Sequence, residues 1–129
     1  MTSVNFKREI AGSMDQAIEK TTQALASEGF GVLTRIDFHL KVKEKLGHEI
    51  RPLVILGACN PKLAYEAFLH NPDVTGLLPC NAVVRELASG KISVEIAKAS
   101  AIMGVIDDGE LKEMADTADQ RLQKVLEKI

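Results

Sequence analysis

Two Cys-Asn dipeptides are the parts of this sequence best suited to chemistry. They are Cys59-Asn60, in the string GACNPK, and Cys80-Asn81, in the string GLLPCN, and they contain both cysteines of the chain. A thiolate attacks electrophiles or binds soft metal ions, and an asparagine amide both donates and accepts hydrogen bonds. We therefore expect all four residues to bind a ligand, and we take Cys59 and Cys80 as the candidate catalytic residues.

The residues around Cys59 predict an activated thiol. Residues 52–57 (PLVILG) form a short apolar run typical of a central strand, and Asn60 and Pro61 suit the cap and first position of a helix over 61–70. Cys59 would then lie at a helix N-terminus, where backbone donors stabilise a thiolate and lower the pKa of the thiol. Cys80 follows Pro79 in a loop that leads into a strand, so the sequence predicts no such activation there.

Two non-covalent functions fit these dipeptides. The first, which we favour, is a small-ligand-binding or oligomeric module with its site near both dipeptides, a function that requires no reaction of any residue. The second is a site for zinc, copper(I) or iron on Cys59 and Cys80. Two thiolates do not complete a four-ligand zinc site, so a further ligand would come from His39, from His48 or His70, from water or from a second subunit.

A third function is thiol or sulfur chemistry, with Cys59 as the attacking thiolate and Cys80 as the resolving thiol. Each residue also has an ordinary structural role, since free cysteines are commonly small buried apolar residues and asparagines commonly cap helices or form turns. The sequence lacks a Gly-rich phosphate loop, a dinucleotide fingerprint, an HExxH helix, a nucleophile elbow and a CxxC pair. It therefore indicates no particular reaction and does not decide whether the protein is an enzyme.

Composition and charge argue against several partners. The chain has 16 basic and 18 acidic residues, a net charge of -2, four Phe, one Tyr and no Trp. Without a basic block or a stacking platform we expect no nucleic-acid partner. Residues 1–10 are polar and no stretch reaches the roughly 18 apolar residues of a membrane span, so we expect a cytoplasmic protein with no membrane partner and with thiols rather than a disulfide. A homodimer is expected because symmetric dimers are the commonest soluble oligomers.

The hydropathy pattern predicts a single α+β domain over residues 1–129, a sandwich of a mainly antiparallel sheet with helices packed on it. The predicted order of elements is β-α-β-α-β-α-β-β-α. Gly90 signals a hairpin between the last two strands, and an apolar stripe after Asp107 or Asp108 predicts a long final helix. The predicted strands cover 4–10, 32–36, 52–57, 81–87 and 91–96, and the other predicted helices cover 38–46, 61–70 and the segment between Ser13 and Gly29.

Several short segments together form a family pattern. They are LGACNP at 56–61, AYEA at 64–67, LLPCN at 77–81 followed by Val83-Val84, and the pairs Ile36-Asp37 and Leu46-Gly47. With these segments the sequence resembles the domain of unknown function 302 family from about Met14 to Ile129. The resemblance implies a compact fold of helices on an antiparallel sheet, and it implies no particular activity.

Overall fold

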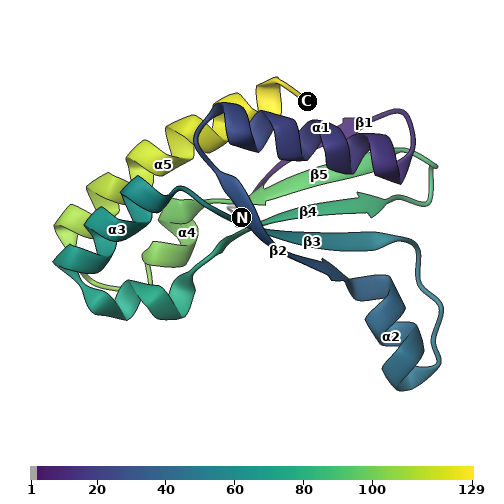
Figure 1. Cartoon of the computed structure of the whole chain (residues 1–129), viewed down its shortest axis with the longest axis horizontal. Coiled ribbons are helices and arrows are strands. Elements are labelled where there is room, and N and C mark those ends of the chain that lie inside the picture. The colour runs from purple at the N-terminus through teal and green to yellow at the C-terminus, as the bar shows by residue number, and fades with distance from the viewer. Residues whose placement is uncertain (1–2) are drawn as a thin grey trace.

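Five antiparallel strands form one sheet in the order β1-β5-β4-β3-β2 (Figure 1). The computed structural model describes residues 3–129. The strands are β1 (Asn5–Ile10), β2 (Gly31–Asp37), β3 (Leu53–Cys59), β4 (Cys80–Glu86) and β5 (Ile92–Ala97). The helices are α1 (Met14–Ser27), α2 (Phe38–Leu46), α3 (Pro61–His70), α4 (Ala99–Met103) and α5 (Gly109–Glu127), and a 3₁₀ helix (Pro72–Leu77) joins α3 to β4.

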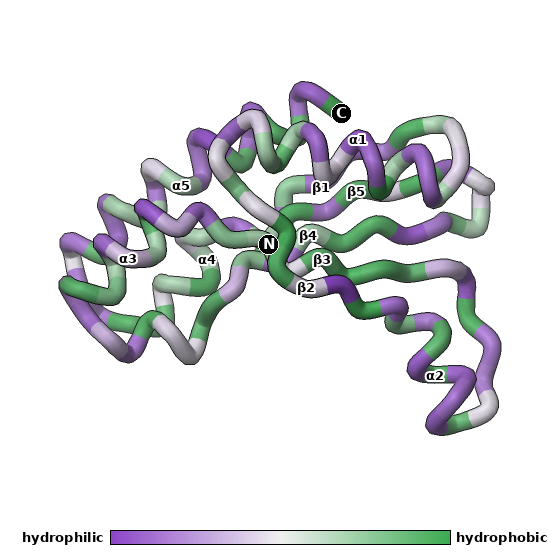
Figure 2. The backbone as a smooth tube through the Cα atoms, viewed as in Figure 1, coloured by the Kyte–Doolittle hydropathy of each residue, from purple (hydrophilic) through white to green (hydrophobic). Residues whose placement is uncertain are grey.

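The core lies between the sheet and two helices, α1 and α5, which pack side by side across one sheet face (Figure 1). α3 and α4 lie beyond the end of the sheet, against α5. Successive side chains of a strand point to opposite faces, so alternate strand residues reach the helices. Figure 2 shows the central strands as largely hydrophobic and α5 as alternating between polar and apolar residues. The buried strand residues include Val54 and Leu56 in β3, Val84 in β4, and Ile92 and Ile96 in β5.

Local capping signals determine where the two long helices begin. Ser13 accepts a hydrogen bond from the Gln16 backbone N–H, and the Gln16 side chain accepts one from the Ser13 N–H, so a capping box starts α1. Asp108 caps α5 by accepting from the backbone N–H groups of Glu110 and Leu111. The sequence leaves Asp107 and Asp108 as alternative caps for this helix, and the structure shows that Asp108 is the cap.

The predicted α+β class and the predicted order of the main strands and helices are confirmed. The structure adds two short helices that the sequence does not predict, α4 and the 3₁₀ helix. Neither is long enough to show a helical apolar period. The start of α4 is stabilised from another element, because the Ser100 backbone N–H and hydroxyl both donate to the Asp119 carboxylate in α5.

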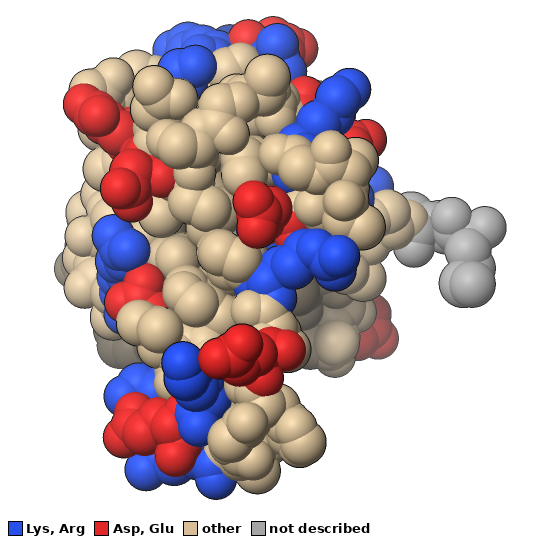
Figure 3. Space-filling view, turned by 90° about the vertical axis from the view of Figure 1, so that its right-hand side faces the viewer, with Lys and Arg blue, Asp and Glu red and all other residues tan. Residues whose placement is uncertain are grey.

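α2 projects from the body of the protein and has no buried residue (Figure 1). It is tied to the start of β3 by a hydrogen bond of 3.0 Å from the Leu53 N–H to His39 Nδ1. Figure 3 shows α2 as the lower lobe, and the basic and acidic side chains on this face are interspersed rather than gathered by sign. Within residues 3–129, no helix combines the length and hydropathy of a membrane span.

Gly57 is a position where we expect no side chain to fit. It lies in β3 opposite Thr34 of β2, and a Cβ here would collide with Thr34 Oγ1 and lie 2.9 Å from Pro79 Cγ. We predict that Gly57→Ala lowers the free energy of unfolding by about 1–3 kcal/mol, the usual cost of overpacking, as measured by chemical denaturation. Gly31→Ala is the matched control, because a Cβ there would meet no atom within 4 Å. Equal losses in the two variants would contradict the steric explanation.

Candidate functional site

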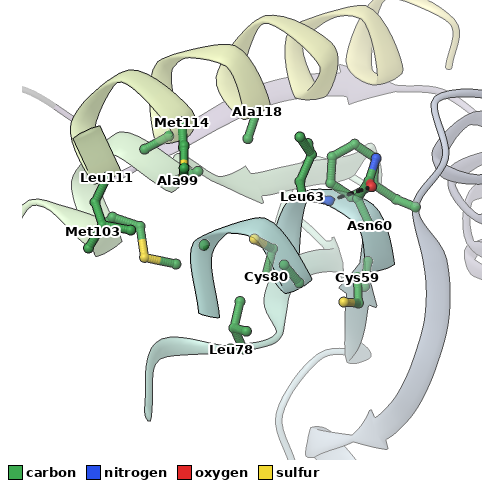
Figure 4. A pocket seen from close by; sticks show the side chains of 15 residues that line it. Cys59, Asn60, Leu63, Leu78, Cys80, Ala99, Met103, Leu111, Met114 and Ala118 are labelled. Atoms are coloured by element: carbon green, nitrogen blue, oxygen red, sulfur yellow. Dashed lines mark hydrogen bonds between the residues drawn. The ribbon is translucent and has the colours of Figure 1, made fainter. Parts of the chain in front are cut away.

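A cavity of about 60 Å³ lies where the end of β3 and the start of β4 meet α3, α4 and α5 (Figure 4). Apolar side chains, two cysteines and one asparagine form its wall. Many of the lining residues are alanines, which reach only one carbon from the backbone and so leave space that larger side chains would fill. The alanines are Ala58, Ala64, Ala67, Ala99, Ala115 and Ala118.

Four sulfur-containing side chains line this cavity, each from a different element. Cys59 ends β3, Cys80 begins β4, Met103 ends α4 and Met114 lies in α5. The strand register pairs Ala58 with Cys80, so the two cysteines occupy neighbouring positions on adjacent strands. In Figure 4 the side chains of Cys80 and Met103 extend toward each other, and Met114 reaches down from α5. Cys59 lies apart from these three side chains, at the end of β3 (Figure 4). The fold therefore gathers the side chains of Cys80, Met103 and Met114 in one part of the wall.

Burial raises the pKa of both thiols. It raises the pKa of Cys80 to about 11, with smaller contributions from Cys59 and the Asp119 carboxylate, and it also raises the pKa of Cys59. The predicted lowering of the Cys59 pKa is therefore wrong. Asn60, not Cys59, caps α3, and the Leu63 N–H donates to the Asn60 side chain rather than to a thiolate. Because the thiolate is the reactive form, the structure does not support Cys59 as a nucleophile.

The two asparagines have different positions. Asn60 is buried and lines the cavity, but its Oδ1 accepts the helix-capping hydrogen bond from Leu63 at 3.2 Å. Asn81 lies opposite Gly57 in β4, is exposed and is not among the cavity-lining residues. Strand alternation turns the Asn81 side chain to the sheet face opposite the Cys80 side chain, so Asn81 does not line this cavity with Cys80.

None of the three histidines lines the cavity that contains Cys59 and Cys80. His39 contacts Leu53 at the start of β3, whereas Cys59 is the last residue of that seven-residue strand. Strand residues rise about 3.3 Å each, so roughly 20 Å separates the two positions and His39 is wrong as a third ligand within one chain. His48 is exposed in the segment after α2. Within residues 3–129, no group of three or more His, Cys, Asp or Glu side chains is arranged to hold a metal ion.

His70 instead fastens α3 to α5, two of the helices that line the cavity. Its Nε2 lies 2.8 and 2.9 Å from the two carboxylate oxygens of Asp108, and its Nδ1 lies 2.9 Å from Glu110 Oε2. The hydrogen bond to Asp108, followed by the negative charges of Asp108 and Glu110, raises the pKa of His70 despite some desolvation. The same hydrogen bond lowers the pKa of Asp108. The carboxylates flank the ring on opposite sides, so they do not converge on one metal position.

Sequence reasoning missed the two methionines of the site. Met114 belongs to the apolar stripe of the final helix, where a methionine is an ordinary core residue, and Met103 lies in a helix that the sequence does not predict. The only available signal was that sulfur-containing residues are few and that half of the methionines lie in the last third of the chain. That signal does not place them beside Cys59 and Cys80.

Protonated His70 is expected to stabilise the protein. Its folded-state pKa is raised, so its contribution is fully present below the unfolded-state pKa of about 6.5 and is lost as the pH rises through the higher folded-state value. We predict that His70→Gln lowers the thermal midpoint more at about pH 6 than at about pH 9. Thermal unfolding of the wild type and the variant across this range measures the difference.

His48→Gln serves as the matched control for this experiment, because His48 is exposed and lies away from the cavity. The titration of Asp108 does not affect the comparison between about pH 6 and about pH 9. Its pKa is lowered below the ordinary value of 3.8, so its contribution is lost only as the pH falls through that lower value. A loss in His70→Gln that is the same at every pH would contradict the ionic role of His70.

Slow alkylation is expected at both cysteines. The thiolate is the reacting species, so rates with iodoacetamide should be low at neutral pH and should keep rising beyond the ordinary thiol pKa of about 8.5. Cys80 should react more slowly than Cys59 because it is the more deeply buried thiol. Mass spectrometry of Cys59→Ser and Cys80→Ser, each of which leaves one thiol, measures the two rates. A rate at Cys59 that levels off below about pH 8 would instead indicate an activated thiolate.

Comparison with known proteins identifies the family. The protein-family model described as "Domain of unknown function DUF302" matches residues 6–129. This match begins earlier than the resemblance found in the sequence, which covers about residues 14–129. The crystal structure of an uncharacterized conserved DUF302 protein from Bacillus stearothermophilus is 31% identical in sequence, with a TM-score of 0.92 and 98% of each chain covered. No functionally curated protein matches the sequence. The chain belongs to the DUF302 family.

Proposed function

We propose that this protein is a binding module that holds one small, uncharged or soft ligand in the cavity between β3, β4 and helices α3, α4 and α5. The cavity itself carries the proposal, because well-packed cores contain few spaces larger than a water molecule. Here alanines from β3, α3, α4 and α5 line the space, together with the larger side chains of Phe30, Leu63 and Leu111. An apolar concave space with few polar groups is typical of a small-molecule site.

The size of the cavity limits the ligand. A water-sized occupant needs roughly 10–15 Å³ of such space, so about 60 Å³ accommodates roughly four to six non-hydrogen atoms. A nucleotide, a sugar or a peptide segment exceeds this volume. The ligand is therefore a very small molecule or an ion, unless the helices move apart.

The chemistry of the wall favours binding over catalysis. Among the described residues that line the cavity, none is Asp, Glu, Lys, Arg or His. The two thiols have raised pKa values, and the Asn60 oxygen already accepts a hydrogen bond. The wall thus offers van der Waals contact and polarisable sulfur, and it supplies no general acid or base that works near neutral pH.

Xenon is a suitable probe for this proposal, because dry apolar cavities bind it. We predict that xenon-saturated buffer shifts the NMR methyl signals of cavity alanines such as Ala67 and Ala115 and leaves the exposed Ala26 signal unchanged. Ala115→Leu should abolish these shifts by filling the space. It should keep or raise the free energy of unfolding, by about 0.5–2 kcal/mol, as cavity-filling substitutions commonly do.

Ala26→Leu is the matched control, since it makes the same change at an exposed position of α1. Xenon binding should be unchanged in this variant. Shifts that persist in Ala115→Leu, or shifts of equal size at methyl groups outside the cavity, would contradict the proposal.

A further inference from the structure

We propose that the ligand of this cavity is Cu(I), bound by the sulfur atoms of Cys80, Met103 and Met114, with Cys59 as an additional thiol at the end of β3. This inference rests on the proposed binding function and names the class of ligand. It differs from the metal site expected from the sequence, which used His39 and no methionine.

The distribution of sulfur in the chain is the first support. The chain has two cysteines and four methionines, and both cysteines and two of the methionines line the same small cavity. Met14 lies in α1 and is not part of the cavity wall. A single methionine in a cavity is an ordinary gap filler. Four sulfur side chains from four separate elements around one space are more than gap filling requires.

The kind of donor selects the metal. Thiolates and thioethers are soft ligands that suit Cu(I), whereas a structural zinc site usually has four protein ligands drawn from cysteine thiolates, histidines and carboxylates. Protein-bound iron-sulfur clusters commonly take four cysteines. Among the described residues of the cavity wall there are two cysteines and no histidine or carboxylate. The two methionine thioethers therefore favour copper(I) over zinc or an iron-sulfur cluster at this site.

The charge of the ion fits the cavity as well. A lone charge in an apolar environment is costly, and no charged side chain lines this space among the described residues. One Cu(I) ion and one thiolate neutralise each other. The remaining ligands, Met103 and Met114, are uncharged, so a single deprotonated cysteine completes an electrically neutral site.

The positions of the side chains are compatible with a shared ion. Figure 4 shows the Cys80 and Met103 side chains extending toward each other, with Met114 above them, and the small side chain of Ala99 lies in the same part of the wall. Cys80 and Met114 are held by β4 and α5. Met103 is held by α4, whose start is bound to Asp119 of α5 through Ser100.

Binding requires the loss of one proton. The Cys80 S–H bond breaks, its proton passes to solvent, and the sulfur electron pair forms the bond to Cu(I), with no change in the oxidation state of copper or sulfur. Copper therefore competes with a proton for the Cys80 sulfur, so the affinity should rise with pH, by up to about tenfold per pH unit.

An anaerobic titration tests the proposal on the reduced full-length chain. Cu(I) is supplied as its acetonitrile complex, and the chromophoric chelator bicinchoninate competes for it. We predict one Cu(I) per chain, sulfur-only ligation in X-ray absorption spectra, and affinity losses of at least about tenfold in Cys80→Ser, Met103→Leu and Met114→Leu. Met-to-Leu changes conserve volume and usually cost less than about 1.5 kcal/mol, so these variants should still fold.

Met14→Leu is the matched control, because it removes a thioether outside the cavity, and it should bind Cu(I) like the wild type. Equal affinity in Met103→Leu, Met114→Leu and the wild type would show that copper binds the thiols alone and would overturn the proposal. Stoichiometric Zn²⁺ binding that depends on both cysteines and is tighter than Cu(I) binding would also overturn it. Xenon binding without Cu(I) binding would reject the metal and keep the binding cavity, and failure of both probes would reject both proposals.

Discussion

The antiparallel register of β3 against β4 is the constraint on which the cavity depends. It sets Ala58 opposite Cys80, which turns both side chains toward the helices, and it sets Gly57 opposite Asn81, which turns Asn81 to the other face. Strand side chains alternate between faces, so a slip of one residue would exchange these two pairs and remove Cys80 from the cavity. The buried apolar residues of both strands favour the observed register, and so does the close approach of Pro79 to Gly57, which has no side chain.

Short-range signals account for the parts of the fold that the sequence predicts correctly. The cap at Ser13, the Asn60-Pro61 pair and the glycine at Gly90 each act within a few residues, so their effect is visible in the sequence. α4 has no comparable signal, because Asp119 of α5 satisfies the donors at its start. Elements that are stabilised from distant positions are the ones that local patterns do not reveal.

The residues of the candidate site also fall into two groups, those that short-range signals predict and those that depend on tertiary packing. The sequence correctly predicts Asn60 as a helix cap, but the direction of the Cys59 pKa shift depends on burial, which only the packed structure determines. His39 is excluded because α2 holds it against Leu53 at the start of β3, whereas Cys59 is at the other end of that strand. Met103 and Met114 are included because α4 and α5 fold back over the strand ends. The direction of a pKa shift, the sheet face of a strand residue and the position of a helix all depend on tertiary packing. The spacing of residues in the sequence does not predict them.

Burial of Cys80 has opposite consequences for two kinds of chemistry. A thiolate alone in the cavity would lack both water and a positively charged neighbour among the described lining residues, so the thiol keeps its proton and is a poor nucleophile. A cation bonded to the sulfur removes this penalty, because the two opposite charges cancel where neither would be tolerated alone. Thioethers add soft donors without adding charge. The neutral wall that weakens the case for a free thiolate therefore strengthens the case for a ligand that brings its own single positive charge.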